Sequence, residues 1–460
     1  MTLCSEEIIE VRYCLLRHKG DEYQLYKPSD DAPCKVRVCK DPLPSLLERV
    51  KEEIKAHYGV DVYGLRWILP DDIPRVYVPE PTLLLFVNSQ EILDERKWIN
   101  QSLLEKLAQR GKIPKADAEL FRHALKALPR QPWSHYRWFP ETWDWLDQQL
   151  QDHRLTNRRN GVEQISISSP ACVLAANSPS GRFFFKAVRD NYRYEVNLTA
   201  WLSQTFPDAT PSMVVADIAN ARYLCHSSGD RSLLDLQDFT LWQLALQRLG
   251  ILQHTCVLHV AEIHNLGVPS QPLGQLPDRL ASVLRRAINV LREGKQQITT
   301  TQMSLIPRAL TTVARLCRQL ESFHLPETLV HCDLNPSNIV CGERGPTFID
   351  WTYSSVTHPF LALSFCLFCC KDPAHVLHKQ YAPLAEGYLD KWINGGSVTH
   401  LSNALEVASE LAPYYDSLVA LNLLLERLAD TPGELTSVRE VVNSMIGYCD
   451  KVGGLRVDRQ

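Results

Sequence analysis

The chain has 460 residues, enough for two or three domains that each bury a core. Hydrophobic residues make up 45% and charged residues 22%, as in ordinary globular proteins, and the net charge of −4 argues against a nucleic-acid or anionic-membrane surface. The acidic N-terminal stretch lacks the layout of a signal peptide, and the longest apolar run, 359–370, is too short for a bilayer. We therefore expect a cytoplasmic protein in which the 14 cysteines are reduced thiols.

The first part of the chain, 1–150, holds most of the tryptophans: Trp67, Trp98, Trp133, Trp138, Trp143 and Trp145. Alternating and helical patterns predict strands at 8–16, 24–26, 63–69 and 75–78 and helices at 46–58 and 103–128. We therefore expect a separate α+β domain. Its order is similar to a Nudix-type domain, with Glu48–Glu53 where that family's acidic helix falls. The glycines and first glutamate of the Nudix motif are absent, and a solvated helix face explains the same charges, so we expect no hydrolase chemistry.

A tryptophan cluster at 133–145 predicts the junction to the second domain. Such rings usually pack at an interface, because each buries a large apolar area. Alternatively, the rings form an exposed surface on which a sugar stacks, although buried rings are commoner than exposed ones. The polar segment 151–160, with three arginines and few apolar residues, predicts a linker.

Residues 162–226 predict a small lobe of strands with one helix. Strands are expected at 165–167, 172–175, 182–188, 211–217 and 222–225, and a helix at 194–205. Lys186 lies on the third of these strands among Phe183, Phe184 and Phe185, where a lysine is usually snorkelling or paired. Glu195 opens the helix, and a surface ion pair is the simplest interpretation of the two charges.

Residues 227–460 predict a mainly helical part. Helices are expected at 239–264 and 309–323, a polar loop at 295–301, a buried helix within 359–370, and further helices after Cys370. The cysteines near Cys370 lack the paired short spacing of zinc ligands, and the histidines and cysteine within 254–264 point to different helix faces. We therefore expect no structural zinc site.

The most informative stretch of the sequence is His331-Cys332-Asp333-Leu334-Asn335-Pro336-Ser337-Asn338, followed by Phe348-Ile349-Asp350-Trp351. Strands are expected at 328–330, 338–341 and 347–349, with a turn at 342–346. This hairpin brings Asn338 and Asp350 to one end, where a single ion can bridge them. Phosphoryl transfer from a nucleotide needs such a set, because it requires a base near the attacking hydroxyl and oxygen ligands for magnesium.

These residues resemble the catalytic loop and metal-binding aspartate of the aminoglycoside phosphotransferase and choline kinase superfamily. That family's pattern is His-Gly-Asp, four residues, Asn, and then Asp-Trp on the next strand. The resemblance implies Asp333 as the base or hydroxyl-orienting group, Asn338 and Asp350 as Mg²⁺ ligands, and His331 as a structural residue of the loop 331–338. The chain departs from the pattern at Cys332, where glycine is usual, which puts loop flexibility in question more than chemistry.

The resemblance also implies an α+β, bilobal protein-kinase-like fold after the N-terminal domain, with a small lobe at 162–226 and a helical large lobe at 227–460. In such a fold the strand lysine, Lys186, holds the ATP phosphates and pairs with Glu195. No glycine-rich loop is present, and Ser168 and Ser169 stand where it would turn. Cys225 precedes the expected hinge 226–230, whose backbone would hold adenine. The late helices would supply the acceptor site, where the most ligand-like residues are Tyr414, Tyr415 and Asp416.

The sequence thus predicts an ATP- and magnesium-dependent phosphotransferase that acts on a hydroxyl group of a small molecule. Neither a nucleic-acid nor a membrane partner is expected, and the identity of the acceptor is open. A pseudokinase-like binding or scaffold protein, which recognises a partner through its tryptophan-rich N-terminal domain, is the alternative. The absent glycine loop and Cys332 favour that alternative, whereas the presence of Lys186, Asp333, Asn338 and Asp350 together favours the enzyme.

Overall fold

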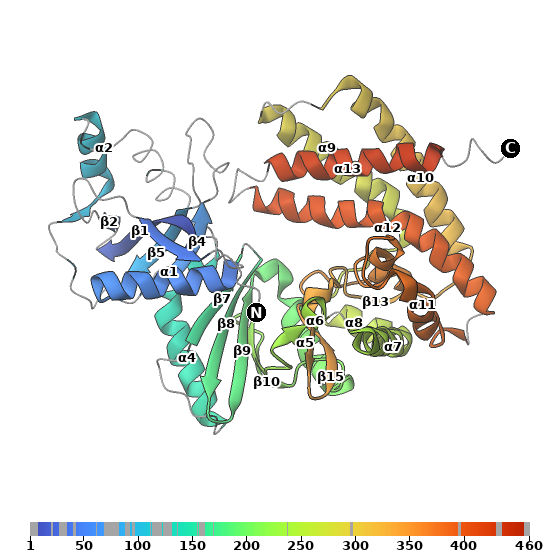
Figure 1. The fold of residues 1–460 in the computed structure, drawn as a ribbon, viewed down its shortest axis with the longest axis horizontal. Helices are drawn as coiled ribbons and strands as arrows, with labels where there is room; N and C mark the ends of the chain where they lie inside the picture. The colour runs from blue at the N-terminus through green and yellow to red at the C-terminus, as the bar shows by residue number, and fades with distance from the viewer. Residues whose placement is uncertain are drawn as a thin grey trace. The chain divides into compact units, whose positions relative to one another are not determined.

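A computed structural model describes residues 8–19, 22–26, 35–39, 43–60, 62–68, 82–87, 93, 97–110, 112, 122, 131–135, 137–153, 155, 162–168, 170–236, 238–294, 298–393, 397–428 and 435–454. The chain forms two compact units (Figure 1). The first unit comprises 1–189 with 427–434, and the second comprises 190–426 with 435–460. Among the described residues, no helix has the length and hydropathy needed to span a membrane.

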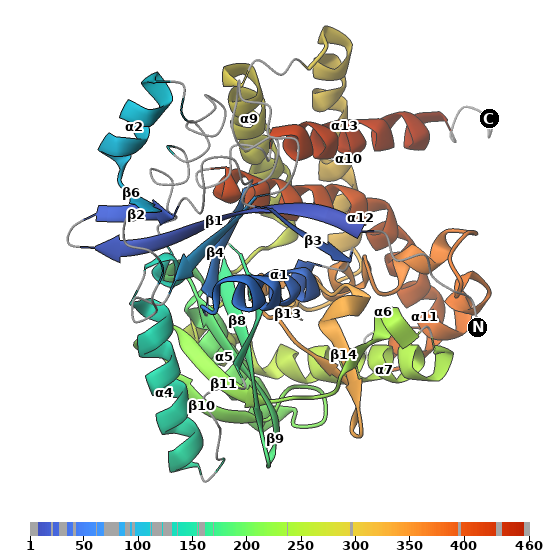
Figure 2. The same cartoon turned by 60° about the vertical axis from the view of Figure 1, so that its left-hand side comes forward.

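The first unit is built on a six-stranded sheet in the order β4-β5-β1-β2-β6, with β3 also paired to β1. Its strands are β1 (Ile8–Lys19), β2 (Glu22–Tyr26), β3 (Lys35–Cys39), β4 (Val62–Ile68), β5 (Thr82–Val87) and β6 (Trp98–Ile99). Helix α1 (Leu43–Tyr58) lies along the sheet (Figure 2) and shares one apolar core with it. Val50 and Ile54 on the helix and Leu83 on β5 are fully buried there, and each such side chain contributes about 1.5–3 kcal/mol by leaving water.

The structure tests one of two further predictions for the first unit. Helix α2 (Gln101–Gln109) ends in a turn at Arg110, so the continuous helix predicted over 103–128 is wrong. Gly111 and Pro114 follow in the sequence, and both residue types end helices. The strand predicted at 75–78 lies outside the described residues.

Three further strands and a helix also belong to the first unit. Strands β7 (Val162–Ile167), β8 (Ala171–Ser178) and β9 (Gly181–Val188) form an antiparallel meander, and α4 spans Trp138–Asp152. The buried side chain of Gln164 on β7 accepts from the Gly64 amide at 2.8 Å and donates to the Gly64 carbonyl at 3.2 Å. Compact packing therefore groups β7–β9 with the N-terminal sheet, and the division into lobes at 162–226 stays a prediction.

The tryptophan cluster packs against this meander. Trp133 is only 1% exposed, and its indole N–H donates to the Ser168 carbonyl at 3.2 Å. The rings of Trp138 and Trp145 lie 6.1 and 5.7 Å from the ring of Phe185 on β9. The cluster thus has the packing role expected of it, and the burial of Trp133 removes that ring from any sugar-binding surface.

The second unit begins with helix α5 (Tyr194–Thr205), which matches its predicted bounds. Two antiparallel strands follow, β10 (Met213–Asp217) and β11 (Arg222–His226). The next elements are β12 (Arg231–Ser232), α6 (Leu233–Leu236), α7 (Phe239–Cys256), α8 (Val260–Asn265), α9 (Leu276–Glu293) and α10 (Thr300–Glu321). The helix predicted over 239–264 is interrupted at 257–259, where His259 leaves helical geometry with φ −112° and ψ 12°. Thr299, in the predicted loop 295–301, caps α10 through a capping box with Gln302.

The predicted hairpin is present with slightly shifted bounds. Strands β14 (Ile339–Gly342) and β15 (Gly345–Phe348) pair antiparallel and join β12 in a three-stranded sheet. Strand β13 (Thr328–Val330) pairs with β16 (Ser355–Thr357), a short strand that the sequence analysis missed. The loop 331–338 therefore starts from the two-stranded sheet of β13 and β16 and ends at β14 in the three-stranded sheet.

The C-terminal part is helical as predicted. Its helices are α11 (Tyr381–Leu389), α12 (Val398–Arg427) and α13 (Leu435–Gly454), and α9, α10 and α13 pack together (Figure 1). The buried helix predicted within 359–370 is wrong in form, because the apolar run makes two short 3₁₀ turns, η9 (Pro359–Leu363) and η10 (Phe368–Lys371). The backbone of Leu367, at φ −129° and ψ −50°, separates them. The predicted α+β class, with strands before a large helical region, is confirmed.

Candidate active site

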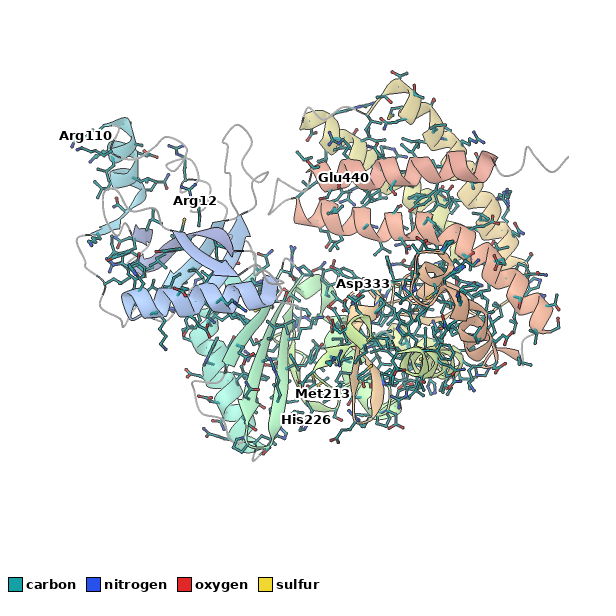
Figure 3. The ribbon with its side chains drawn as sticks, in the orientation of Figure 1. Arg12, Arg110, Met213, His226, Asp333 and Glu440 are labelled. Atoms are coloured by element: carbon teal, nitrogen blue, oxygen red, sulfur yellow. The ribbon has the colours of Figure 1, made fainter. Side chains whose placement is uncertain are left out.

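Asp333, labelled in Figure 3, lies in the loop 331–338, and neighbouring side chains of that loop contact it. The Asn335 amide donates to Asp333 Oδ1 at 3.2 Å, and the Asn338 amide donates to the Asp333 carbonyl oxygen at 2.9 Å. A further contact joins Asn338 Nδ2 to Asp333 Oδ2 at 3.4 Å. Two amides thus fix the direction of one carboxylate, as required of a group that orients a hydroxyl.

Asn338 and Asp350 lie at the same end of the hairpin. The Ile349 amide donates to the Asn338 carbonyl at 3.0 Å, which extends the β14–β15 register to the residue before Asp350. Because Asn338 directs its amide nitrogen to Asp333, its side-chain oxygen is the atom left for a metal ion. An amide oxygen and a carboxylate are hard ligands of the kind Mg²⁺ prefers, so the residues fit this ion.

His331 is placed to hold the loop. Its Nε2 lies 2.8 Å from the Ile349 carbonyl oxygen, and its ring lies 4.6 Å from the ring of Trp351. Both rings are buried, with exposures of 0% and 1%. These contacts join the start of the loop to the segment that carries Asp350, which is the structural role proposed for this histidine.

Cys332 and Asp350 both have left-handed backbones, with φ of +62° and +64°. For residues with a side chain this conformation costs about 1–2 kcal/mol, which explains why glycine is usual at the first position in the resembled family. Here the buried Cys332 thiol lies 3.0 Å from the Tyr415 hydroxyl and 3.1 Å from the Ser355 hydroxyl. The thiol therefore connects the loop 331–338 to α12 and β16.

Glu195 is fully buried and shares a hydroxyl with Asp350. Thr352 Oγ1 lies 2.7 Å from Glu195 Oε2 and 2.6 Å from Asp350 Oδ1, and the Tyr223 hydroxyl donates to Glu195 Oε1 at 3.1 Å. A hydroxyl has one proton, so Thr352 donates to only one carboxylate at a time. Two carboxylates so close together favour a bound cation beside Asp350. The sequence analysis missed Thr352, whose only signal was its place two residues after Asp350.

The remaining nucleotide-site predictions fall on described residues, with one exception. Lys186 on β9 is 5% exposed and lies opposite Val173 of β8. The Ser168 hydroxyl donates to the Ala171 carbonyl at 2.9 Å within its own turn. Cys225 is buried at the end of β11, and Ser169 lies outside the described residues. Their roles in nucleotide binding stay predictions.

On the acceptor side, α12 places Asp416 near the loop. Burial raises the pKa of Asp416 to about 7, its hydrogen bond with Ser364 opposes the rise, and the charge of Asp333 adds to it. Tyr414 and Tyr415 are each 1% exposed: Tyr414 packs on Tyr448, and Tyr415 contacts Cys332. The charge of Asp333 thus acts on Asp416, which links this predicted acceptor-side residue to the loop 331–338.

Arg279 on α9 is a residue that the sequence analysis missed, since α9 itself was not predicted. It is half-buried, and burial lowers the pKa of its guanidinium while Tyr415 and Cys332 oppose the decrease. It makes no hydrogen bond or ion pair with the part of the chain that the structure describes. A guanidinium in this position is an available site for an anionic group.

Residues 247–396 match the model of APH, the phosphotransferase enzyme family. The matched segment contains Asp333, Asn338 and Asp350 in the predicted order, so the predicted resemblance is confirmed, and with it the expectation of a small-molecule phosphotransferase. None of the curated proteins compared with the chain matches it significantly.

The chain is also similar to several solved structures. Macrolide 2′-phosphotransferase MphH from Brachybacterium faecium is 16% identical with a TM-score of 0.44, over 66% of this chain and 98% of that one. Choline kinase LicA from Streptococcus pneumoniae is 12% identical with a TM-score of 0.46, over 67% of this chain and 100% of that one. At these identities neither protein indicates the substrate of this chain.

Proposed function

We propose that this chain uses Mg²⁺ and ATP to phosphorylate a hydroxyl group of a small molecule. The observation that carries the proposal is the coupling of Asp333, Asn338 and Asp350 through one loop and one hairpin register. The base candidate and the two metal-ligand candidates are held by consecutive backbone and amide contacts, so they form a single unit.

The two ends of this unit have different tasks. Asn338 and Asp350 would hold Mg²⁺ through their side-chain oxygens, and the ion supplies positive charge to the phosphates during transfer. Asp333 would accept a hydrogen bond from the acceptor hydroxyl and receive its proton. Asn335 and Asn338 keep that carboxylate in one direction, which is how a protein lowers the entropy cost of the reaction.

Two further residues are proposed for the nucleotide, Lys186 in the first unit and Glu195 in the second. Lys186 would bind the phosphates, as the strand lysine of kinase-like proteins does. The Tyr223 hydroxyl and the Thr352 hydroxyl lie within hydrogen-bonding distance of the two carboxylate oxygens of Glu195, so this buried side chain would orient a positive group from a fixed position. Burial, with the charge of Glu195, raises the pKa of the Tyr223 hydroxyl well above its ordinary value, so that hydroxyl stays a donor.

The acceptor site is proposed beside Asp333, between Asp416 on α12 and Arg279 on α9. Both groups are partly or wholly removed from water and interact with the loop or its neighbours. Because Arg279 is cationic and Asp416 is partly ionised near neutral pH, we expect an acceptor that combines its hydroxyl with a charged group rather than a neutral sugar.

The test is a phosphoryl-acceptor screen with Mg²⁺ and ATP, read by ADP release. Its panel contains hydroxylated amino acids, hydroxy acids, amino alcohols, aminoglycosides and neutral sugars, and Asp333→Asn is the background control. We expect acceptor-dependent ADP release that the control lacks. Calorimetry that shows no binding of Mg-ATP at millimolar concentration would remove the kinase proposal.

One observation favours the scaffold alternative. The Ser168 hydroxyl is engaged within its own turn, so it does not stand ready for a phosphate. A protein that binds Mg-ATP but gives no acceptor-dependent turnover with any class in the panel would fit that alternative better.

A further inference from the structure

Outside the proposed active site, three metal-ligating side chains come together just before α11. They are Cys369 and Cys370 on η10 and His375 in the turn that follows, and their ligand atoms all lie within 4.8 Å of one another. Cys370 is buried, whereas Cys369 and His375 are partly exposed. An ion from solvent can therefore reach a pair of sulfur atoms that the protein already holds.

The separation of the two sulfur atoms fits one zinc ion. Cys369 Sγ and Cys370 Sγ lie 4.0 Å apart. Two thiolates on a tetrahedral zinc, each about 2.3 Å from the metal, are separated by roughly 3.8 Å. A disulfide requires a separation of about 2 Å, so it would demand a larger movement of both side chains.

The backbone around the histidine is fixed by local contacts. The Ala374 amide donates to Asp372 Oδ1 at 2.9 Å, and the His375 amide donates to the Asp372 carbonyl at the same distance. The Trp242 ring packs 6.0 Å from the His375 ring. This side chain is thus directed toward the two cysteines by a turn and a neighbouring helix.

The proposed ligand side chains make local hydrogen bonds that metal binding could replace. The Leu377 amide donates to His375 Nδ1 at 3.2 Å, and the Cys369 thiol donates to the Phe365 carbonyl at 2.8 Å. Cys366 is close in sequence, but its thiol lies 3.5 Å from the Ala362 carbonyl and is not one of the clustered ligands. Three protein ligands leave one tetrahedral position, which solvent can occupy.

We propose that Cys369, Cys370 and His375 bind a zinc ion that fixes the segment 368–378. The cluster was not expected from sequence, because adjacent cysteines followed by a histidine five residues later differ from the usual paired ligand spacing. The segment consists of short turns and bends with no long helix of its own. A metal ion supplies the kind of restraint that such a segment lacks, because binding energy becomes folding energy.

Cobalt is the probe for this site. The full chain, reduced and stripped with a chelator, is titrated with Co²⁺ while its near-ultraviolet and visible spectra are recorded. We expect thiolate-to-cobalt charge-transfer absorption and tetrahedral ligand-field bands that saturate at one ion per chain and disappear on addition of Zn²⁺.

Variants assign the ligands. Cys369→Ser and His375→Gln, which change partly exposed residues, should each weaken cobalt binding at least tenfold and shift the ligand-field bands. Cys341→Ser removes a partly exposed thiol on β14 that lies outside the cluster, and it should leave the titration unchanged. Circular dichroism confirms that each variant is folded.

Two outcomes would overturn the proposal. The first is an absence of cobalt absorption in the reduced parent chain. The second is cobalt absorption that persists unchanged in folded Cys369→Ser and His375→Gln, because other cysteines would then hold the ion. Neither outcome depends on ATP or on an acceptor, so the zinc proposal and the phosphotransferase proposal are tested separately.

Discussion

Asn338 and Asp333 are joined by a hydrogen bond of 2.9 Å from the asparagine side-chain amide to the aspartate carbonyl oxygen. This bond turns the side-chain nitrogen of Asn338 toward Asp333 and its side-chain oxygen away from it. The same residue therefore shapes the loop and would present an oxygen to a metal ion. The proposed base and the proposed metal ligand therefore cannot move independently. Any substitution at Asn338 should alter both the orientation of Asp333 and the binding of the metal ion. Substitutions at Asp333 and Asp350 are therefore better suited to test the two functions separately.

Substitutions at Cys332 should reveal how much free energy of unfolding is lost when a residue with a side chain has a left-handed backbone. Cys332→Gly and Cys332→Ala both lose the contacts to Tyr415 and Ser355, but only the alanine variant keeps a Cβ at φ +62°. After the greater unfolded-state entropy of glycine is subtracted, we expect the glycine variant to be more stable by roughly 0.5–1 kcal/mol. Urea unfolding measures the difference, and an alanine variant as stable as the glycine variant would contradict the backbone assignment.

Thr352 should matter because it supplies a donor to a fully buried carboxylate. Thr352→Val leaves Glu195 with one fewer donor, and we expect a loss of about 1–3 kcal/mol of unfolding free energy. Thr205→Val is the matched control, because its hydroxyl donates to the Trp201 carbonyl on the exposed face of α5. That control should lower the free energy of unfolding by less than about 0.5 kcal/mol. Equal losses in the two variants would show that the shared hydroxyl has no special role.

Asp416 should make stability depend on pH in a defined direction. Its pKa in the folded chain is about 7, above the ordinary value of 3.8, so the folded state holds its proton more tightly than the unfolded state. Its contribution to stability is therefore complete below pH 3.8 and is lost as the pH rises toward 7. Asp416→Asn removes this pH dependence. As the pH rises from 3.8 to 7, the stability of the variant should therefore increase relative to that of the parent.

The measurement for Asp416 is the melting temperature of parent and variant across that pH range. Asp278→Asn, an exposed aspartate on α9, is the control and should follow the parent at every pH. Parallel pH profiles for the parent and Asp416→Asn would mean that Asp416 ionises normally in the folded chain.

Arg279 should act on the acceptor rather than on the nucleotide. Arg279→Gln removes a half-buried guanidinium, so the KM for an acceptor with a carboxylate or phosphate group should rise about tenfold or more. The KM for ATP should stay constant. Arg286→Gln changes an exposed arginine on the same helix and should alter neither value. If Arg279→Gln lowers the KM of the acceptor, the acceptor is cationic and the proposed role of this residue is wrong.

The sequence predicted the elements whose signals are local. The hairpin that carries Asn338 and Asp350 was predicted within two residues at each end, because β-rich runs flank a glycine-containing turn. Helix α5 was predicted with its observed bounds, because its apolar stripe is regular. These patterns span fewer than about twenty residues, a length over which periodicity is informative.

The parts that were missed depend on tertiary contacts. Strand β16 has only three residues and exists because it pairs with β13. The hydroxyl of Thr352 approaches Glu195 from a segment far away in the sequence, and no spacing rule reveals that contact. The zinc-ligand candidates are close in sequence, but their spacing differs from the usual paired ligands. The apolar run 359–370 has the composition of a buried helix, yet it folds into 3₁₀ turns, because composition reports burial more reliably than backbone conformation.

We propose that Asp333 acts on the acceptor hydroxyl and that Asp350 binds the metal ion. A comparison of Asp333→Asn with Asp350→Asn tests this division of roles most directly. Calorimetry gives the Kd of Mg-ATP for each folded variant, and ADP release with an acceptor from the screen gives its turnover. For Asp333→Asn we expect an unchanged Kd and a turnover lower by roughly a hundredfold or more, since only acid–base assistance is lost. For Asp350→Asn we expect weaker Mg-ATP binding as well, since a charged metal ligand is removed. An Asp333→Asn variant that turns over like the parent would contradict the account.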